Sequence, residues 1–215
     1  SGDLDADACK LRNIPVLGTN ERHPDLKIFS YVGMSILKLL LENNIEVFKS
    51  HILLISSGGY LEAVQDVLRR NGADVLVYDP YQSYDSMVEF EAFLERCDAV
   101  VVAEQKNEDL LIGGEGAHIA AKWLLKCKPV VIHIAGALDY DLLEAYGIEK
   151  KPNIRVSYGY MTVTTEYAGM RPVIELHAAG LKVGQAMVEG MRKHHDAKKA
   201  AQFALHHIPA MDFTR

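Results

Sequence analysis

Short, continuously apolar runs alternate along the chain with segments of helical periodicity. The apolar runs are HILLIS at 51–56, DVLVYD at 74–79, AVVVAE at 99–104 and PVVIHIA at 129–135. Between and after them, apolar residues recur at helical spacing. The helices predicted there span 60–71, 86–96, 116–126 and 139–146. Strands that are apolar throughout are typical of a parallel sheet covered on both faces. The pattern predicts an α/β fold with a doubly wound, mostly parallel, Rossmann-like sheet.

Helical periodicity also precedes and follows this region. Residues 24–44 predict a leading helix, because their apolar side chains recur every three or four positions. Residues 154–166 alternate enough for one or two strands. C-terminal helices are predicted over 172–195 and from a cap at Asp196 onward. Glycines within the long helix suggest that another backbone, of the core or of a second subunit, comes close.

Three parts of the chain are predicted from these elements. Residues 1–24 begin with a polar, acidic stretch and are expected to be a disordered segment or a linker. Residues 25–157 are the predicted nucleotide-binding domain. Residues 158–215 would supply a strand and helices that pack on this domain or on a partner subunit, so a homodimer is expected.

The turn after the first apolar run is the main candidate for binding. Gly58 and Gly59 stand between strand and helix, where the first amides point outward and the helix dipole favours an anion. The dinucleotide fingerprint G-x-G-x-x-G, laid over this turn, places Ser56, Gly58 and Leu61 in its three slots. A glycine in the middle slot lets a pyrophosphate approach the backbone. Leu61 would push the helix outward.

A pyrophosphate at this turn would lie across Ser57, Gly58, Gly59 and Tyr60. Asp79, followed by Pro80, ends the second apolar run, where an acidic residue accepts the ribose hydroxyls of an adenosine. A carboxylate there disfavours a 2′-phosphate, so NAD is predicted rather than NADP. The alternative is that Asp79 only begins a turn, since YDPY is rich in turn formers.

The order of parts from 34 to about 150 resembles the cofactor domain of the D-2-hydroxyacid dehydrogenases and of adenosylhomocysteinase. The shared parts are the leading helix, the YDPY ending, the strand CDAVVVAE, and the strand and turn KPVVIHIAGALDYDLL. The resemblance implies an NAD-binding fold with Gly136 near the nicotinamide. The substrate-binding arginine of the dehydrogenases is missing, because Ala135 or Gly136 stands in its place. The Pro-His pair of those enzymes is also missing.

Three residues are candidates for proton transfer in such a site. His133 lies inside an apolar run, Glu104 directly follows one, and Glu166 lies in the unusual stretch YGYMTVTTEYAGMRP at 158–172. Each has a structural alternative. His133 would be a core histidine, Glu104 a helix cap or solvated turn, and 158–172 a β-hairpin that covers the sheet edge.

Two further segments carry polar groups. Thr165 and Arg171 would orient a polar substrate, with Arg171 as the available substitute for the missing arginine. The segment GGEGAH at 113–118 lacks the Lys-Ser/Thr of a phosphate-binding loop, and is interpreted as a flexible connection before a helix that contains Trp123. The pairs His194–His195 and His206–His207 are typical of a solvated helix, so no metal site is predicted.

Composition narrows the class of partner. The chain has 215 residues, a net charge of −6 and an isoelectric point near 5.8, which argues against nucleic acid because a polyanion requires a surplus of Lys and Arg. Three separated cysteines without a C-x-x-C pair favour a reducing cytoplasm. No apolar run approaches the ~18 residues of a membrane span. A small molecule is the expected ligand.

Three functions remain open on these observations. The first is an NAD-binding, Rossmann-type oxidoreductase. The second is an S-adenosylmethionine-dependent methyltransferase, which would use the same glycine turn and Asp79 without needing room for a pyrophosphate. The third is a non-catalytic module that binds a ligand or dimerises.

Overall fold

The computed structural model describes residues 4–82, 87–106 and 108–213. Contacts within it divide the chain into two compact units. Phe29–Ala168 form one, here called the sheet unit, and Ser1–Ile28 together with Gly169–Arg215 form the other, here called the terminal unit. The sequence placed boundaries at 24/25 and 157/158, whereas these units meet at 28/29 and 168/169.

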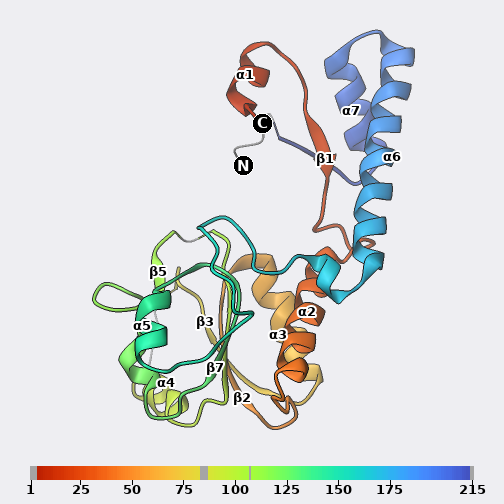
Figure 1. Cartoon of the computed structure of the whole chain (residues 1–215). Helices are drawn as coiled ribbons and strands as arrows, with labels where there is room; N and C mark the ends of the chain where they lie inside the picture. The colour runs from red at the N-terminus through yellow and green to blue at the C-terminus, as the bar shows by residue number, and fades with distance from the viewer. Residues whose placement is uncertain (1–3, 83–86, 107, 214–215) are drawn as a thin grey trace. The chain divides into compact units, whose positions relative to one another are not determined.

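A parallel sheet of five strands forms the centre of the sheet unit (Figure 1). Its order along the sheet is β3-β2-β4-β7-β9. The strands are β2 (His51–Ser56), β3 (Asp74–Tyr78), β4 (Ala99–Ala103), β7 (Val130–Ala135) and β9 (Lys150–Lys151). The first four are the predicted apolar runs, so the predicted doubly wound, mostly parallel α/β fold is confirmed.

The strand order reverses direction next to β2. From β2 the chain proceeds to β3 on one side, and then returns to place β4 on the other side of β2. In open parallel sheets, a ligand binds beyond the carboxyl ends of the strands at such a switch point. The region after Ser56 and Ala103 is therefore where a site is expected.

Helices cover both faces of this sheet, and alternate residues of each strand point to them (Figure 1). On one face lie α2 (Ile28–Glu42) and α3 (Gly58–Arg70), which pack on Ile52 and Leu54. On the other lie α4 (Met87–Leu94) and α5 (Tyr140–Ala145), near Leu53 and Ile55. The predicted leading helix is α2, and the helix expected from residue 60 begins at Gly58. The start predicted for α4, residue 86, lies outside the described residues.

The helix predicted over 116–126 is wrong. That part of the chain instead contributes to a second sheet of order β6-β5-β8, followed by a short 3₁₀ helix, η1 (Ala121–Leu124), that contains Trp123. The strands are β5 (Leu110–Gly113), β6 (Ile119–Ala120) and β8 (Ala137–Leu138). The GGEGAH segment therefore joins two strands rather than leading into a helix.

The strands predicted over 154–166 are also absent from the described structure. This stretch runs through turns and bends to a short 3₁₀ helix, η2 (Thr165–Ala168). The amide of Thr162 donates to the carbonyl of Ile134 at 2.8 Å, which attaches the stretch to the end of β7. The interpretation as a β-hairpin is wrong, because the described residues of this stretch form turns and a 3₁₀ helix and contain no strand.

The terminal unit joins segments from the two ends of the sequence. It contains α1 (Ala6–Leu11) and β1 (Leu17–Thr19), then α6 (Met170–His194), α7 (Ala197–His207) and β10 (Ala210–Asp212). Strand β1 pairs antiparallel with β10. Residues before 25 were expected to be disordered or a linker, and the described ones contain a helix and a strand instead. The two C-terminal helices and the cap at Asp196 are confirmed, since the carboxylate of Asp196 accepts from the amide of Lys199.

Candidate functional site

The turn between β2 and α3 has the backbone geometry of an anion-binding helix start. Gly58, the first residue of α3, has φ +57°, a conformation that favours glycine. Ser57 precedes it in extended conformation, and its side chain makes no capping hydrogen bond. The amides that open α3 are thus not capped by the residue that usually caps them. This turn follows the central strand β2, at the switch point of the sheet.

A lysine from the end of β4 reaches this turn. A methyl group on Gly58 would lie 3.4 Å from Nζ of Lys106. The backbone amide of Lys106 donates to Oε1 of Glu104 at 2.7 Å, and Glu104 itself is buried directly after β4. A cation therefore stands beside the first residue of the helix. Lys106 was missed in the sequence, where it lies in a charged stretch that looks like a solvated turn.

Other predicted binding residues have structural partners. The hydroxyl of Ser56 is fully buried and donates to the carbonyl of Ala103 at 2.7 Å, so it joins β2 to β4. A methyl group on Gly59 would come within 2.6 Å of the ring of Phe29, which means that glycine allows α3 to approach α2. Tyr60 packs edge-to-face on the same ring at 4.9 Å. Leu61 is partly buried, and α3 is accommodated beside the sheet without a glycine there.

Asp79 forms a turn, as the alternative interpretation proposed. Its Oδ1 accepts from the amide of Tyr81 at 3.0 Å and its Oδ2 from the side chain of Gln82 at 2.9 Å. Pro80 is half-buried beside it. A carboxylate has about four acceptor positions, so these two bonds leave capacity for hydroxyl groups of a ligand.

Acidic groups surround the end of β3. The pKa of Tyr81 is raised, first by burial and then by the negative charges of Glu104, Asp109 and Asp79. The hydroxyl of Tyr158 approaches the carbonyl of Lys106 at 3.4 Å. The carboxyl edge of the sheet thus combines one lysine with several carboxylates, a mixture that matters for the choice of ligand.

His133 and Gly136 fix the turn after β7. His133 is fully buried, and its Nε2 lies 2.9 Å from the carbonyl of Gly136, which makes that nitrogen the donor. Burial lowers the pKa of His133 to about 4, so the ring is neutral at physiological pH. Gly136 has φ +114°, and a methyl group there would lie 2.5 Å from Leu111. These contacts match the core histidine that was the alternative to a catalytic one.

The remaining predicted residues lie farther along the chain. Glu166 is exposed and Thr165 half-buried in η2. Arg171 is exposed in the first turn of α6 and belongs to the terminal unit. Their roles in proton transfer and substrate binding stay predictions.

A chain of polar contacts next to Asp79 was not predicted. The hydroxyl of Tyr78 lies 3.3 Å from Nδ1 of His118, and Nε2 of His118 lies 3.5 Å from a carboxylate oxygen of Asp109. Burial raises the pKa of Tyr78. The tyrosine, histidine and carboxylate come from three different segments, so only the fold brings them together.

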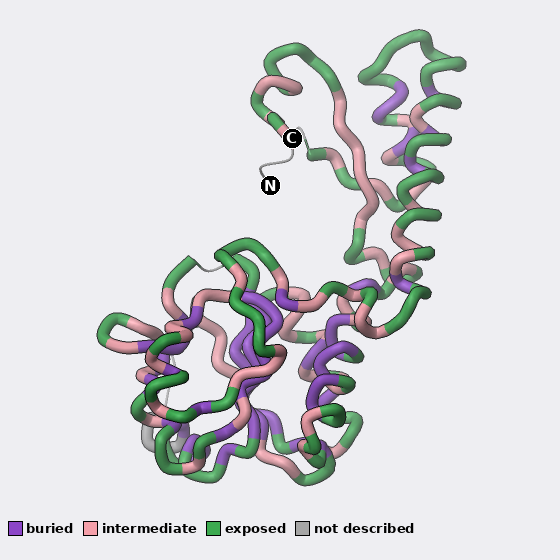
Figure 2. The backbone as a smooth tube through the Cα atoms, viewed as in Figure 1, coloured by how far each residue is buried: buried purple, intermediate pink, exposed green. Residues whose placement is uncertain are grey.

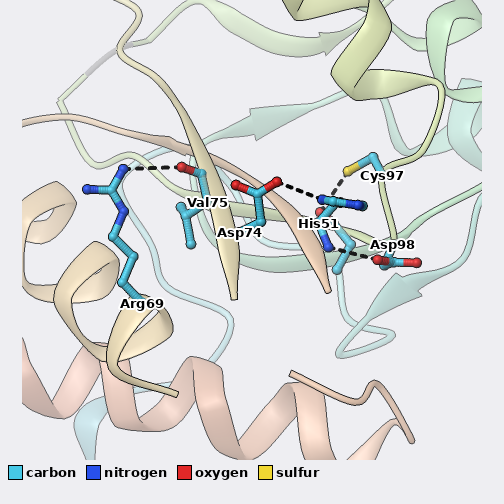
Figure 3. A network of polar contacts seen from close by, with 7 residues as sticks. His51, Arg69, Asp74, Val75, Cys97 and Asp98 are labelled. Carbon is cyan, nitrogen blue, oxygen red and sulfur yellow. Dashed lines mark hydrogen bonds and ion pairs between the residues drawn. The ribbon is translucent and has the colours of Figure 1, made fainter. Parts of the chain in front are cut away.

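The opposite, amino-terminal edge of the sheet carries a separate polar network (Figure 3). Nδ1 of His51 lies 2.8 Å from a carboxylate oxygen of Asp74, and its backbone amide donates to Asp98 at 2.8 Å. These contacts tie the starts of β2, β3 and β4 together. Ligands of doubly wound sheets bind at the other edge, so this network is structural.

The described residues contain no group of three or more His, Cys, Asp or Glu side chains arranged to hold a metal ion. Among the helices in the described ranges, none combines the length and the apolar character required to cross a bilayer.

The strand order and the glycine turn at its switch point define a Rossmann-like fold, and solved structures share it. The TT0316 protein from Thermus thermophilus matches with a TM-score of 0.55 and 14% identity over 87% of this chain and 72% of that one. This match confirms the predicted Rossmann-like fold.

Two named dehydrogenases match more weakly. NAD⁺-bound 3-phosphoglycerate dehydrogenase of Entamoeba histolytica has a TM-score of 0.42 and 16% identity over 92% of this chain and 71% of that one. The bifunctional enzyme FolD, a methylenetetrahydrofolate dehydrogenase/cyclohydrolase of Campylobacter jejuni, has a TM-score of 0.44 and 11% identity over 88% of this chain. The chain covers only 58% of that enzyme. No protein-family model and no curated protein matches the sequence.

Proposed function

We propose that the chain binds NAD at the carboxyl edge of the central sheet and acts as a Rossmann-type oxidoreductase on a small molecule. One observation carries this proposal: Gly58, in its left-handed conformation, opens α3 at the switch point with Nζ of Lys106 beside it. A helix start whose N-cap side chain makes no capping hydrogen bond, with an adjacent ammonium group, is suited to a pyrophosphate.

In this proposal, a dinucleotide would contact the following residues. The amides from Ser57 to Tyr60 and the ammonium group of Lys106 would hold the pyrophosphate. The carboxylate of Asp79 would accept hydrogen bonds from the ribose hydroxyls at the acceptor positions that its turn does not use. Gly136 would border the nicotinamide. Bound NAD supplies the acceptor or donor of a hydride, and the protein contributes position and charge.

Among the predicted proton-transfer residues, Glu104 suits this site best. It lies buried directly after β4 and accepts a hydrogen bond from the amide of Lys106. It is therefore close to the lysine that lies beside Gly58. His133 is neutral and inside the core, where it holds the turn at Gly136. Glu104 would therefore hold the proton that accompanies hydride transfer.

The acidic surroundings support a second candidate, an S-adenosylmethionine-dependent methyltransferase. Glu104, Asp109 and Asp79 are close enough to raise the pKa of Tyr81. Such carboxylates repel a phosphate-rich ligand but attract a sulfonium cation. Asp79 would serve the ribose of either ligand.

Ligand-dependent thermal stability distinguishes these candidates. NAD is expected to raise the melting temperature of the full chain, because a ligand at about 100 times its Kd stabilises by about 2.7 kcal/mol. NADP is expected to stabilise less, since its 2′-phosphate would face Asp79. Lys106→Ala should weaken the NAD response, whereas Lys122→Ala, which removes an exposed lysine of η1, should preserve it.

Different results of this experiment favour different candidate functions. Stabilisation by S-adenosylmethionine or S-adenosylhomocysteine but not by NAD would replace the first candidate with the second. If NAD stabilises the two lysine variants equally, the proposed pyrophosphate site is wrong. No response to any of the ligands would favour the non-catalytic module.

A further inference from the structure

Helix α6 displays a row of exposed apolar positions along its whole length. The helix has 25 residues, and on one face Val183, Ala186 and Gly190 are buried. Much of the helix is exposed (Figure 2), and a row of residues at regular spacing is exposed throughout. The row consists of Met170, Ile174, His177, Leu181, Gly184, Val188 and Met191.

The spacing of this row is that of a helix–helix seam. Its positions alternate at intervals of four and three residues, which is a seven-residue repeat with a mean of 3.5. A row that repeats every 3.5 residues stays in contact with a second helix when the two helices wind around a shared axis. On a straight, isolated helix, the same row drifts around the surface by about 20° per repeat. A solvent-facing helix surface normally carries polar residues instead.

The exposed apolar surface is large enough to require a partner. The five large apolar side chains of the row are between 41% and 76% exposed, and Leu181 is the most exposed of them. The helix is about 37 Å long at 1.5 Å per residue. Two such rows together would bury on the order of 1,000 Å², about the minimum of a specific interface.

A twofold axis between residues 182 and 183 places the large side chain of Leu181 opposite the small position Gly184 of a second copy. The same axis places Ile174 opposite Met191 and His177 opposite Val188 of that copy. A methyl group on Gly184 would have no neighbour within 4 Å in the chain, so this position offers space for the leucine. A parallel arrangement would instead place glycine opposite glycine.

We propose that two copies of this chain associate through α6, antiparallel, with the row of one copy packed on the row of the other. This pairing requires no other segment and is independent of the nucleotide site. It gives the long helix a partner on its exposed apolar face, and it specifies the homodimer expected from the sequence.

Sedimentation velocity of the full chain over a concentration series tests the association. The wild type is expected to show a monomer–dimer equilibrium. Leu181→Glu places a charge at the centre of the seam and should weaken the dimer by at least about tenfold. Leu41→Glu, which changes a leucine of α2 that is 57% exposed, should leave the dimer unchanged. Circular dichroism of both variants should match the wild type, because neither substitution alters the core.

Disulfide mapping tests the direction. Chains with Leu181→Cys are mixed with chains with Gly184→Cys, oxidised, and analysed by mass spectrometry of the linked peptides. The antiparallel pairing predicts bonds between position 181 of one copy and position 184 of the other. Bonds that form only between two copies of position 181 would overturn it. A wild type that stays monomeric, or a dimer that Leu41→Glu weakens as much as Leu181→Glu does, would overturn the association itself.

Discussion

The sheet unit and the terminal unit differ in what they bury: Figure 2 shows continuous buried stretches (purple) at the centre of the sheet unit and separate buried positions along the C-terminal helices. In the sheet unit, Ile52, Leu53, Leu54 and Ile55 form a continuous strand with no exposed surface. In the terminal unit, the buried residues of α6 and α7 are small. They are Pro172, Val183, Ala186, Gly190, Ala200, Ala201 and Ala204.

This difference has an energetic consequence. A buried leucine or isoleucine contributes about 1.5–3 kcal/mol, whereas an alanine adds only one methyl group beyond glycine. The sheet unit therefore has a core of its own, and the terminal unit depends on close backbone approach and on whatever covers α6.

Thiol reactivity should differ most between the units. Cys97 of the sheet unit is buried, and burial raises the pKa of its thiol to about 12 from an ordinary value of 9.0. At pH 8 its thiolate population should be about 1,000-fold below that of an ordinary cysteine. Cys9 of the terminal unit is partly exposed and should react first with a thiol-specific reagent. Comparable rates for the two cysteines in the folded protein would refute the contrast in burial.

Acid should destabilise the sheet unit through His133. The unfolded chain binds a proton at this residue below pH 6.5, whereas the folded chain does so only below about pH 4, because burial disfavours the charged ring. The contribution of His133 is thus complete above pH 6.5 and is lost as pH falls towards 4. The loss amounts to about 3 kcal/mol. Denaturant unfolding at several pH values should show a shallower acid loss in His133→Gln. An identical slope in the variant would contradict the assignment.

Two glycines of α6 should respond in opposite directions to alanine. A methyl group on Gly190 would lie 2.7 Å from the backbone of Ala200 in α7, so Gly190→Ala should cost about 1–3 kcal/mol by overpacking. A methyl group on Gly180 would lie 3.8 Å from Oγ1 of Thr19, an ordinary contact, so Gly180→Ala should stabilise by up to about 1 kcal/mol through helix propensity. Thermal unfolding followed by circular dichroism measures both. If both variants change the stability in the same direction, α6 and α7 do not pack as described.

Helix caps should have the smallest effects, and they should be local. Asp196 accepts from the amide of Lys199 at 2.8 Å and begins α7, while Asp139 accepts from the amide of Leu142 at 3.0 Å and begins α5. Each change to alanine should cost about 1 kcal/mol. Hydrogen exchange should report the loss in the terminal unit for Asp196→Ala and in the sheet unit for Asp139→Ala. Loss of protection in both units for either variant would mean that they unfold together.

The local sequence pattern was sufficient to predict four strands of the central sheet. The runs at β2, β3 and β4 are apolar at every central position, and the run at β7 is interrupted only by His133, so periodicity and length identified all four. The stretch from 116 to 126 looks helical by spacing, but the preceding LLIG pairs with β6 and β8, and strand pairing prevailed over propensity. Strand β1 exists only because it meets β10 from the far end of the chain.

The candidate site was predictable only in part. Gly58 and Asp79 stand at recognisable positions after apolar strands, and the structure places both at the carboxyl edge. The sequence gives no sign of the role of Lys106, because nothing in a charged turn indicates which side chain will lie close to Gly58. The contact of His118 with Tyr78 joins the residue just before β6 to the last residue of β3. Such groupings depend on tertiary structure rather than on spacing.

The pairing of β1 with β10 also determines how the molecule would respond to a pulling force. Leu17, which begins β1, lies opposite Asp212, which ends β10. Tension applied through the two ends of the chain would therefore open this short ladder one rung at a time, like a zipper, rather than shear it all at once. The ends would separate at low force while the parallel sheet between them remained intact, so a two-step extension trace is the mechanical signature of this connectivity.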